Sequence, residues 1–118
     1  MSCLFIAFEK FVNINHEIIR KTICDSLANN DPIMKDIDTN IILTTEDPDY
    51  IKKMRSINTM GSAIEIQAFC NIYNASVRCY ITLDRSTYVD FVTLYPNEFT
   101  KNFRQLIKTG AYCKKCIQ

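Results

Sequence analysis

The sequence predicts an α+β domain in which several helices precede a small β-sheet. Apolar residues recur at helical spacing as far as about Asn74, and from Ala75 onward the period changes to two. The length of 118 residues suits one domain with a hydrophobic core of its own. Because helices followed by paired strands are typical of α+β architecture, we treat residues 1–118 as a single domain of this class.

Two amphipathic helices are predicted at the start of the chain. The first extends from Cys3 to about Val12, where the apolar residues at helical spacing are Leu4, Phe5, Phe8, Phe11 and Val12. The second opens at Asn15, a good N-cap residue, and its apolar stripe contains Ile19, Ile23 and Leu27. The run Asn-Asn-Asp-Pro at positions 29–32 ends it. A helix that begins at Cys3 places this thiol at a helix N-terminus.

Two Asp-Pro pairs predict further helix starts, because aspartate caps a helix and proline fits its first position. Asp31 and Pro32 predict a short helical turn. Asp47 and Pro48 predict a longer helix, with Tyr50, Ile51 and Met54 facing inward and Lys52, Lys53 and Arg55 facing water. No further helix is predicted between these two pairs.

A capping box predicts the start of the central helix. Gly61 is a break, and Ser62 and Glu65 then match the motif in which the serine and the glutamate bond each other's backbone amides. The helix extends to about Asn74, and apolar residues surround most of its axis: Ile64, Ile66, Ala68, Phe69, Ile72 and Tyr73. A helix with this pattern is expected to be the most buried one.

Two strands and a last helix are predicted after residue 75. In the first strand, expected to be half-buried, inward Val77, Cys79, Ile81 and Leu83 alternate with outward Ser76, Arg78, Tyr80 and Thr82. Residues 84–87 form a turn, and the second strand runs from Tyr88 to Leu94. Beyond Pro96, a helix is predicted that contains Phe99, Phe103, Leu106 and Ile107 and closes at Thr109 and Gly110.

The composition excludes several classes of function. With 14 basic and 13 acidic residues the net charge is +1, so neither nucleic acid nor an anionic membrane is an expected partner. The chain has 2 glycines, too few for the glycine-rich loops that cradle phosphates, and no cofactor is expected. The apolar run at residues 3–8 is too short to span a membrane and lacks the features of a signal peptide.

The 6 cysteines are irregularly spaced, and without a secretory signal they predict reduced thiols and a cytoplasmic or nuclear location. Cys24, Cys70 and Cys79 lie in apolar patterns and are expected in the core. Cys113 and Cys116 form one C-x-x-C motif, which offers two ligands where structural zinc takes four. A basic tail is therefore the better interpretation of this motif, and no metal site is expected.

Three segments, in this order along the chain, are similar to one known family. They are SCLFIA at residues 2–7, HEIIR at residues 16–20 and YIKKMRSINTMGSAIEIQAF at residues 50–69. They resemble, respectively, the nucleophile box, the start of the second helix, and the helix–turn–helix segment of the ovarian-tumour (OTU) cysteine proteases, most of which remove ubiquitin from proteins. The likeness covers residues 3–99, and residues 100–118 diverge as a C-terminal helix and tail. It implies an OTU-like cysteine-protease fold, with helices packed on a small sheet.

The resemblance places Cys3 at the family's nucleophile and Glu98 at its catalytic histidine, with Phe99 at the tyrosine that follows. A helix N-terminus favours the thiolate form of a cysteine by lowering its pKa. Acyl transfer also needs an acid that titrates near neutrality to protonate the leaving amine, and a histidine supplies it. Glu98 is not expected to act as the base, because a carboxylate beside a thiol raises the thiol's pKa by like-charge repulsion.

The sequence departs from the family at other positions. Only two residues precede Cys3, so the family's aspartate three positions earlier is missing. Met60 stands where the family's turn has tryptophan, and Ser62 stands at its second glycine. His16, the only histidine, is at the far end of the predicted first helix, roughly 13 to 15 Å from the thiol at about 1.5 Å per residue. A working pair needs about 3 Å, so we expect His16 on the surface, in the first turn of the second helix.

The resemblance thus implies a domain related to ubiquitin-specific cysteine isopeptidases, with ubiquitin or a ubiquitin-like protein as the expected partner. The departures at the site predict that the domain is catalytically impaired. Two explanations fit equally: a pseudoenzyme that binds ubiquitin or another partner, or a truncated or divergent copy that lacks the start of the catalytic box. The alternative from another class is a non-catalytic protein-interaction module that does not recognise ubiquitin. The sequence does not specify an oligomeric state.

Overall fold

The computed structural model describes residues 3–96 and 103–107. In these ranges the helices are α1 (Cys3–Val12), α2 (His16–Ala28), α3 (Thr39–Glu46), α4 (Tyr50–Met54) and α5 (Ala63–Tyr73). The strands are β1 (Ser76–Tyr80), β2 (Tyr88–Val92) and β3 (Phe103–Ile107). The helices precede the strands, which confirms the predicted α+β class. None of the helices in the described ranges combines the length and the apolar character needed to cross a membrane.

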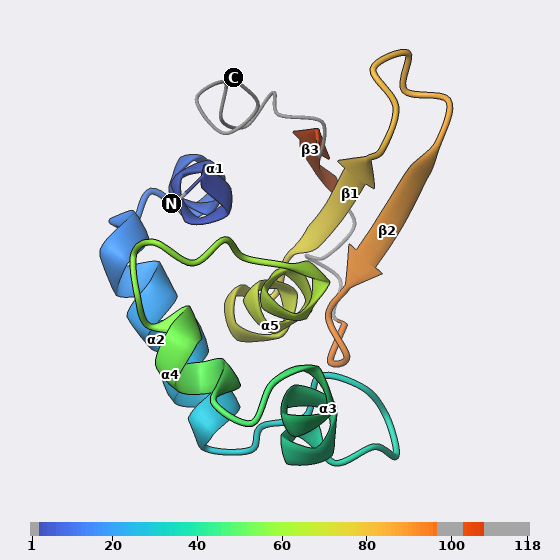
Figure 1. The fold of residues 1–118 in the computed structure, drawn as a ribbon. Helices are drawn as coiled ribbons and strands as arrows, with labels where there is room; N and C mark the ends of the chain where they lie inside the picture. Colours follow the sequence, from blue (N-terminus) through green and yellow to red (C-terminus); the bar gives the residue numbers. More distant parts are fainter. Residues whose placement is uncertain (1–2, 97–102, 108–118) are drawn as a thin grey trace.

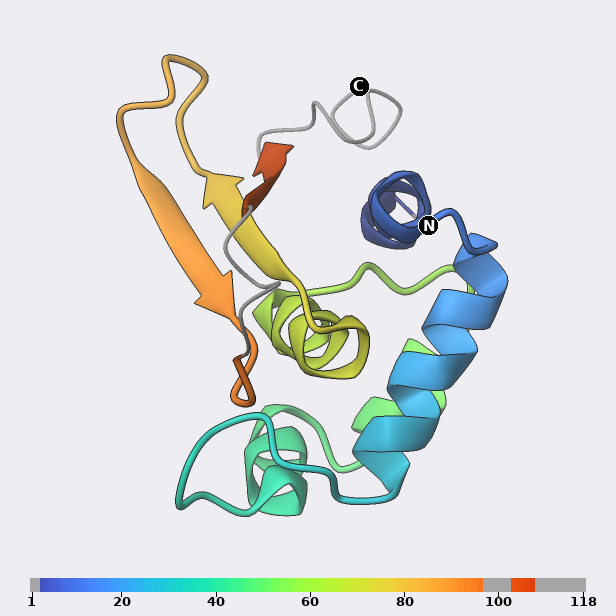
Figure 2. The same cartoon turned by 180° about the vertical axis from the view of Figure 1, so that it is seen from behind.

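Helix α5 lies in the middle of the molecule, with the sheet on one side and α2 and α4 on the other (Figure 1 and Figure 2). Helix α1 packs on it through aromatic rings, because Phe8 stacks on Phe69 with ring centroids 4.0 Å apart. Both rings are fully buried. Stacked rings of this kind add to the stabilisation that burial provides. The prediction of a central helix after Ser62 is therefore confirmed.

The helices with clear caps begin and end where the sequence predicts. The side chain of Asn15 accepts a hydrogen bond from the backbone of Glu17 (2.8 Å) and starts α2, which ends before Asn29. In the capping box of α5, the Ser62 N–H donates to Glu65 Oε1 at 2.7 Å. Both caps satisfy backbone groups that a helix end leaves without a partner, which is why these boundaries can be read locally.

The region between the two Asp-Pro pairs differs from the prediction. Bends and turns follow Pro32 instead of a helical turn, and an unpredicted helix, α3, begins after Asp38, whose side chain caps it. The α3 sequence is rich in β-branched residues of modest helix propensity, so its period gives a weak signal. A tertiary contact compensates for this low helix propensity: Thr39 is buried, and its hydroxyl donates a hydrogen bond to the Asp31 carbonyl at 2.6 Å. The other helix, α4, is only 5 residues long and has Asp49 as its N-cap.

The sheet has the strand order β2-β1-β3, with β1 antiparallel to β2 and parallel to β3. β1 is the central strand, with a partner along each edge, and residues on both of its faces are buried: Ser76 and Tyr80 as well as Val77 and Cys79. The predicted half-buried strand is therefore wrong in this respect. It was also predicted to continue to Leu83, which is instead 77% exposed in the loop between β1 and β2.

The helix predicted after Pro96 is wrong where the structure describes the chain, because Phe103–Ile107 is the strand β3. Leu106 points into the core and is 2% exposed. On the other face, the Arg78 guanidinium lies over the rings of Tyr88 (4.2 Å) and Phe103 (5.0 Å), and so links all three strands. The sequence did not reveal this strand, because the apolar residues Phe103, Leu106 and Ile107 within it also fit helical spacing.

Candidate functional site

Cys3, the predicted nucleophile position, is the first residue of α1 and is 3% exposed. The expected place at a helix N-terminus is therefore confirmed. The expectation of reduced thiols is wrong at this residue, because Cys3 is disulfide-bonded in the structure. A sulfur in a disulfide carries no thiolate, so Cys3 has to be reduced before it can attack a carbonyl.

The remaining residues of the predicted site and tail have no described position. Glu98 and Phe99, aligned with the family's histidine and tyrosine, lie outside the described residues. The C-x-x-C motif of Cys113 and Cys116 also lies outside them. In the described ranges, no group of three or more His, Cys, Asp and Glu side chains is arranged to hold a metal ion.

The only histidine is held at the other end of α1. The backbone N–H of His16 donates to Glu9 Oε1 at 3.1 Å, and its Nδ1 lies 3.5 Å from the same oxygen. Glu9 follows Cys3 by six residues, which is about 9 Å along a helix axis. His16 is thus in the first turn of α2, as predicted, although it is half-buried and not on the open surface. The sequence prediction that His16 is not a partner of Cys3 is confirmed by this placement.

The turn before α5 packs tightly against the helix that begins with Cys3. A Cβ added at Gly61 would lie 2.5 Å from Leu4 Cδ2, and Leu4 is itself buried. A side chain at position 61 would force the buried Leu4 side chain to shift, so glycine permits the close approach of this turn to the first turn of α1. An apolar cavity of about 220 Å³ opens at the same place, between Leu4, the turn and the inner face of the sheet, where Phe91 and Leu106 line it.

The chemistry of this cavity is that of an apolar contact surface. Among the described residues that line it there is no carboxylate, histidine, lysine or arginine, and Cys79 supplies its one sulfur. It therefore offers shape and hydrophobic contact but no acid or base. Cys24 and Cys70 are buried thiols elsewhere in the core, and burial raises their pKa values to about 11 and about 12. Such thiols stay protonated at neutral pH, and the burial of Cys24, Cys70 and Cys79 confirms the prediction that these cysteines lie in the core.

Two charged residues inside the fold were not predicted to be buried. Arg20 on α2 is 4% exposed and donates from Nη1 to the Met54 carbonyl (2.7 Å) and from Nη2 to the Thr59 carbonyl (3.0 Å). Its guanidinium also lies 4.1 Å from the centroid of the Phe5 ring. Arg20 thereby joins α1, α2 and the turn before α5. Its position four residues before Cys24, on the buried side of α2, is the sequence signal that could have found it.

The second buried charge is Glu65 in the first turn of α5. Its carboxylate accepts hydrogen bonds from the Tyr50 hydroxyl (2.7 Å) and the Ser62 hydroxyl (2.8 Å). Burial raises the pKa of Glu65 above its ordinary value, although these hydrogen bonds act in the opposite direction. Burial, together with the negative charge of Glu65, also raises the pKa of Tyr50. The capping box was predicted, but its link to Tyr50 depends on how α4 packs.

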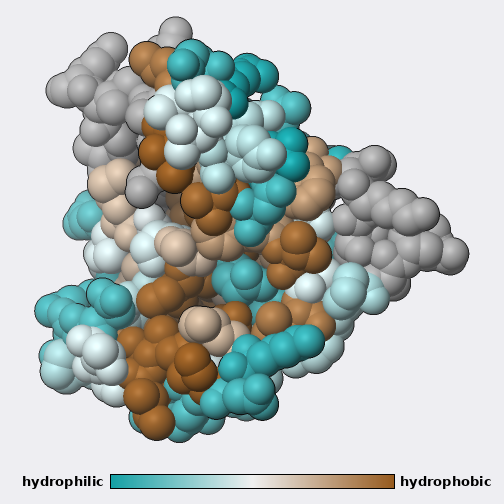
Figure 3. Space-filling view, turned by 90° about the vertical axis from the view of Figure 1, so that its right-hand side faces the viewer, coloured by the Kyte–Doolittle hydropathy of each residue, from teal (hydrophilic) through white to brown (hydrophobic). Residues whose placement is uncertain are grey.

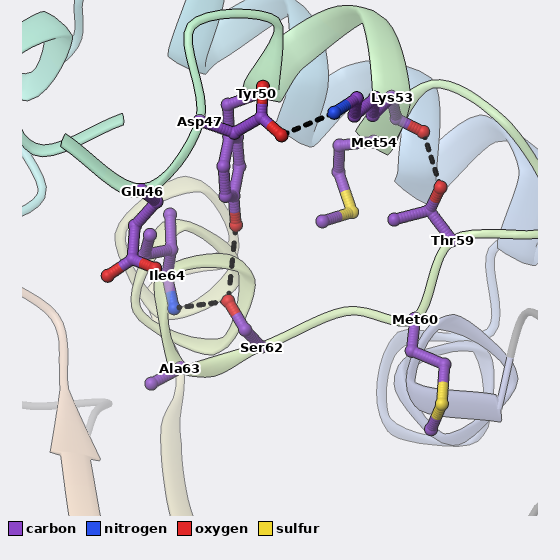
Figure 4. Close-up of a pocket in the computed structure, with 10 residues that line it drawn as sticks. All are labelled: Glu46, Asp47, Tyr50, Lys53, Met54, Thr59, Met60, Ser62, Ala63 and Ile64. Carbon is purple, nitrogen blue, oxygen red and sulfur yellow. Dashed lines mark hydrogen bonds and ion pairs between the residues drawn. The ribbon is translucent and has the colours of Figure 1, made fainter. Parts of the chain in front are cut away.

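A second hollow of about 440 Å³ lies between α4 and the turn before α5 (Figure 4). Tyr50 and Ser62 point toward each other across it, with their hydroxyl oxygens 3.2 Å apart. Asp47 and Lys53 form an ion pair at its edge, and Glu46 lies on its other side (Figure 4). This hollow therefore differs from the apolar cavity beside Leu4, because charged side chains line it as well as apolar ones.

Apolar side chains also gather on the outer surface, on the side of the molecule where β2 lies (Figure 3). Met34 and Tyr95 are 51% and 61% exposed, and with Ile37 and Leu94 they line a shallow hollow between the segment before α3 and the segment that follows β2. Exposed apolar surface of this kind is typical of protein-contact sites.

Neither a protein-family model nor a curated protein matches the chain.

Proposed function

We propose that the chain is an OTU-like domain, related to ubiquitin-specific cysteine isopeptidases, that keeps the nucleophile position at Cys3 and is catalytically impaired. The order of the three similar segments supports this proposal, together with the place of Cys3 at the start of α1. The close contact of Leu4 with Gly61 supports it further, because the turn of the third segment then lies beside the helix of the first.

The observation that carries the proposed impairment is the position of His16. The chain has one histidine, and Glu9 holds it at the end of α1 opposite Cys3. Proton transfer needs a group within hydrogen-bond reach of the reacting atoms. A helix N-terminus alone lowers the pKa of a thiol but supplies no proton to a leaving amine. We therefore expect no measurable turnover of ubiquitin chains by the reduced protein.

A ubiquitin probe tests the catalytic part of this proposal. The reduced protein is incubated with ubiquitin whose C-terminus carries a thiol-reactive propargyl amide, and the products are separated by mass. We expect no adduct, and Cys3→Ala serves as the matched control for labelling of other cysteines. An adduct that is lost in Cys3→Ala, or cleavage of a ubiquitin chain, would contradict the proposed impairment.

Binding is tested separately from catalysis. Titration of ¹⁵N-labelled ubiquitin with the unlabelled protein is expected to shift a contiguous set of ubiquitin amides, and Cys3→Ala is expected to leave these shifts in place. An unchanged ubiquitin spectrum would remove the support for a ubiquitin-binding pseudoenzyme.

The second candidate function is a protein-interaction module that does not recognise ubiquitin. The exposed apolar side chains of Met34, Ile37 and Tyr95 are the observation that favours it, because they offer a contact surface away from Cys3. The ubiquitin titration separates the two functions: a silent ubiquitin spectrum favours this second candidate and counts against the first.

A further inference from the structure

From the hollow between α4 and the turn before α5, we propose that the protein binds a lysine side chain of a partner protein there, with the ammonium group at Glu46. This site is independent of Cys3 and of the proposed function. Its volume of about 440 Å³ is ample for one long side chain, and it is lined by both apolar and acidic groups.

The charges of the hollow favour a cation. Asp47 and Glu46 are the acids that line it, and Lys53 is the base. The Asp47 carboxylate is already satisfied, because Oδ1 accepts the Asp49 N–H (2.8 Å) and Oδ2 pairs with Lys53. Glu46, in contrast, forms no hydrogen bond or ion pair with any residue in the described part of the chain, and it is exposed. Its negative charge is therefore available to a ligand.

The place of Glu46 in the fold makes the electrostatic potential around its carboxylate more negative. Glu46 is the last residue of α3, where the helix dipole also puts partial negative charge. A carboxylate at this end is unfavourable for the helix, and a bound cation would relieve the repulsion. The negative charge of Glu46 also reaches the Tyr50 hydroxyl, since it contributes to the raised pKa of that group.

The remaining walls suit the aliphatic part of a lysine. Met54, Met60 and Ile64 supply apolar surface; in the view of Figure 4 the Tyr50 ring lies between Glu46 and the two methionines, and Ile64 is on the same side of the ring as Glu46. Long cationic side chains bury their methylene groups along such surfaces while the charged end meets an acid. Met60 is 51% exposed, and Ile57 in the same turn is 61% exposed. This apolar rim gives a partner's backbone a contact that a free amine could not use.

Methionine methyl groups allow a direct binding test. The chain has 4 methionines, of which Met54 and Met60 line the hollow and Met34 lines a different one. The ligand is Nα-acetyl-lysine methylamide, and the matched neutral ligand is its Nε-acetylated form. We expect the charged ligand to shift the Met54 and Met60 methyl signals and to leave Met34 unchanged, with the neutral ligand binding more weakly. Equal shifts with the two ligands, or no shift at Met54 and Met60, would overturn the proposal.

Substitution of the acid completes the test. Glu46→Gln is expected to weaken binding roughly threefold to fivefold, which corresponds to the loss of one exposed ion pair. Glu17→Gln, at an exposed position in the first turn of α2, is the matched control and is expected to bind as the unmodified protein does. An unchanged affinity in Glu46→Gln refutes the role of Glu46. Cadaverine, a diamine without a backbone, is expected to bind more weakly, and equal affinity would refute the assignment to a protein side chain.

Discussion

At the scale of single residues, the described part of the fold depends on charges that are buried together with their partners. A buried charge is tolerated when hydrogen bonds replace the water it has lost, and removal of one partner is costly. Arg20 meets this condition through two backbone carbonyls, and Glu65 meets it through two hydroxyl groups and one backbone amide. Arg20 also interacts electrostatically with Glu65, so each charge lowers the free-energy cost of burying the other.

Replacement of Arg20 by lysine tests the first of these sites. The planar guanidinium of Arg20 donates to the Met54 and Thr59 carbonyls from two different nitrogens. Lysine keeps the charge, but its single ammonium nitrogen cannot reproduce this arrangement. We expect Arg20→Lys to lower the free energy of unfolding by about 1 to 3 kcal/mol, measured by urea denaturation. Arg55→Lys is the matched control, because Arg55 pairs with Asp25 on the surface and such pairs contribute little. Equal effects of the two substitutions would contradict the anchoring role of Arg20.

The pH dependence of stability tests Glu65. Its pKa is raised above the ordinary value of 4.5 in the folded protein, so the folded state holds this proton to higher pH than the unfolded state does. The free energy of unfolding therefore falls as the pH rises from about 4.5 through the raised pKa. We expect Glu65→Gln to lack this fall, whereas Glu17→Gln retains it, in urea denaturation at a series of pH values. The same slope in Glu65→Gln as in the unmodified protein would show that Glu65 is not its source.

At the scale of elements, helices were predicted better than strands because their signals are local. Each helix signal joins residues that are close in the chain: Asn15 caps α2, Ser62 caps α5, and each helix carries its own apolar stripe. Both helices could therefore be located from the sequence. Helix α3 was missed because its stabilising contact, from Thr39 to Asp31, lies outside its own repeat. Strand β3 was taken for a helix, since only its pairing with β1 decides between the two periods.

Substitutions in β3 distinguish a strand from a helix. In the strand, Leu106 faces the core, and the adjacent Gln105 points to the opposite face and is exposed. Leu106→Ala is expected to lower the free energy of unfolding by about 2 to 5 kcal/mol, and Gln105→Ala to change it little. Amide hydrogen exchange of β1 should also become faster in Leu106→Ala, because β1 bonds to β3. Unaltered β1 protection would mean that β3 does not pair as described.

At the scale of the whole molecule, the state of Cys3 links the start of α1 to the chemistry of the site. While the disulfide is present, the predicted nucleophile position carries no thiolate, and burial raises the pKa values of the Cys24 and Cys70 thiols. The apolar cavity beside Leu4 and the charged hollow beside Tyr50 lie on different walls of the turn before α5. These two hollows therefore offer separate places for contact, the first apolar and the second lined by charges as well.

Alkylation in denaturant measures this redox state directly. Under denaturing conditions all reduced cysteines react, and intact mass then counts them among the 6 in the chain. We expect the protein purified without reductant to take up two fewer alkyl groups than the reduced protein, and Cys3 to be missing from the labelled peptides. Cys24→Ser is the control, because it should remove one alkyl group from both samples. Full labelling of Cys3 without reductant would contradict the disulfide.

The sequence by itself determined the α+β class, the position of α1, α2 and α5, the place of Cys3 at a helix N-terminus and the separation of His16 from it. Each of these follows from periodicity or from a cap, which are interactions between residues close in the chain. The tertiary structure alone decided that β1 is central, that β3 is a strand, that Arg20 is buried and that Glu65 binds Tyr50. These features depend on contacts between residues that are distant in the sequence, and the energies of such contacts cannot be inferred from a local sequence pattern.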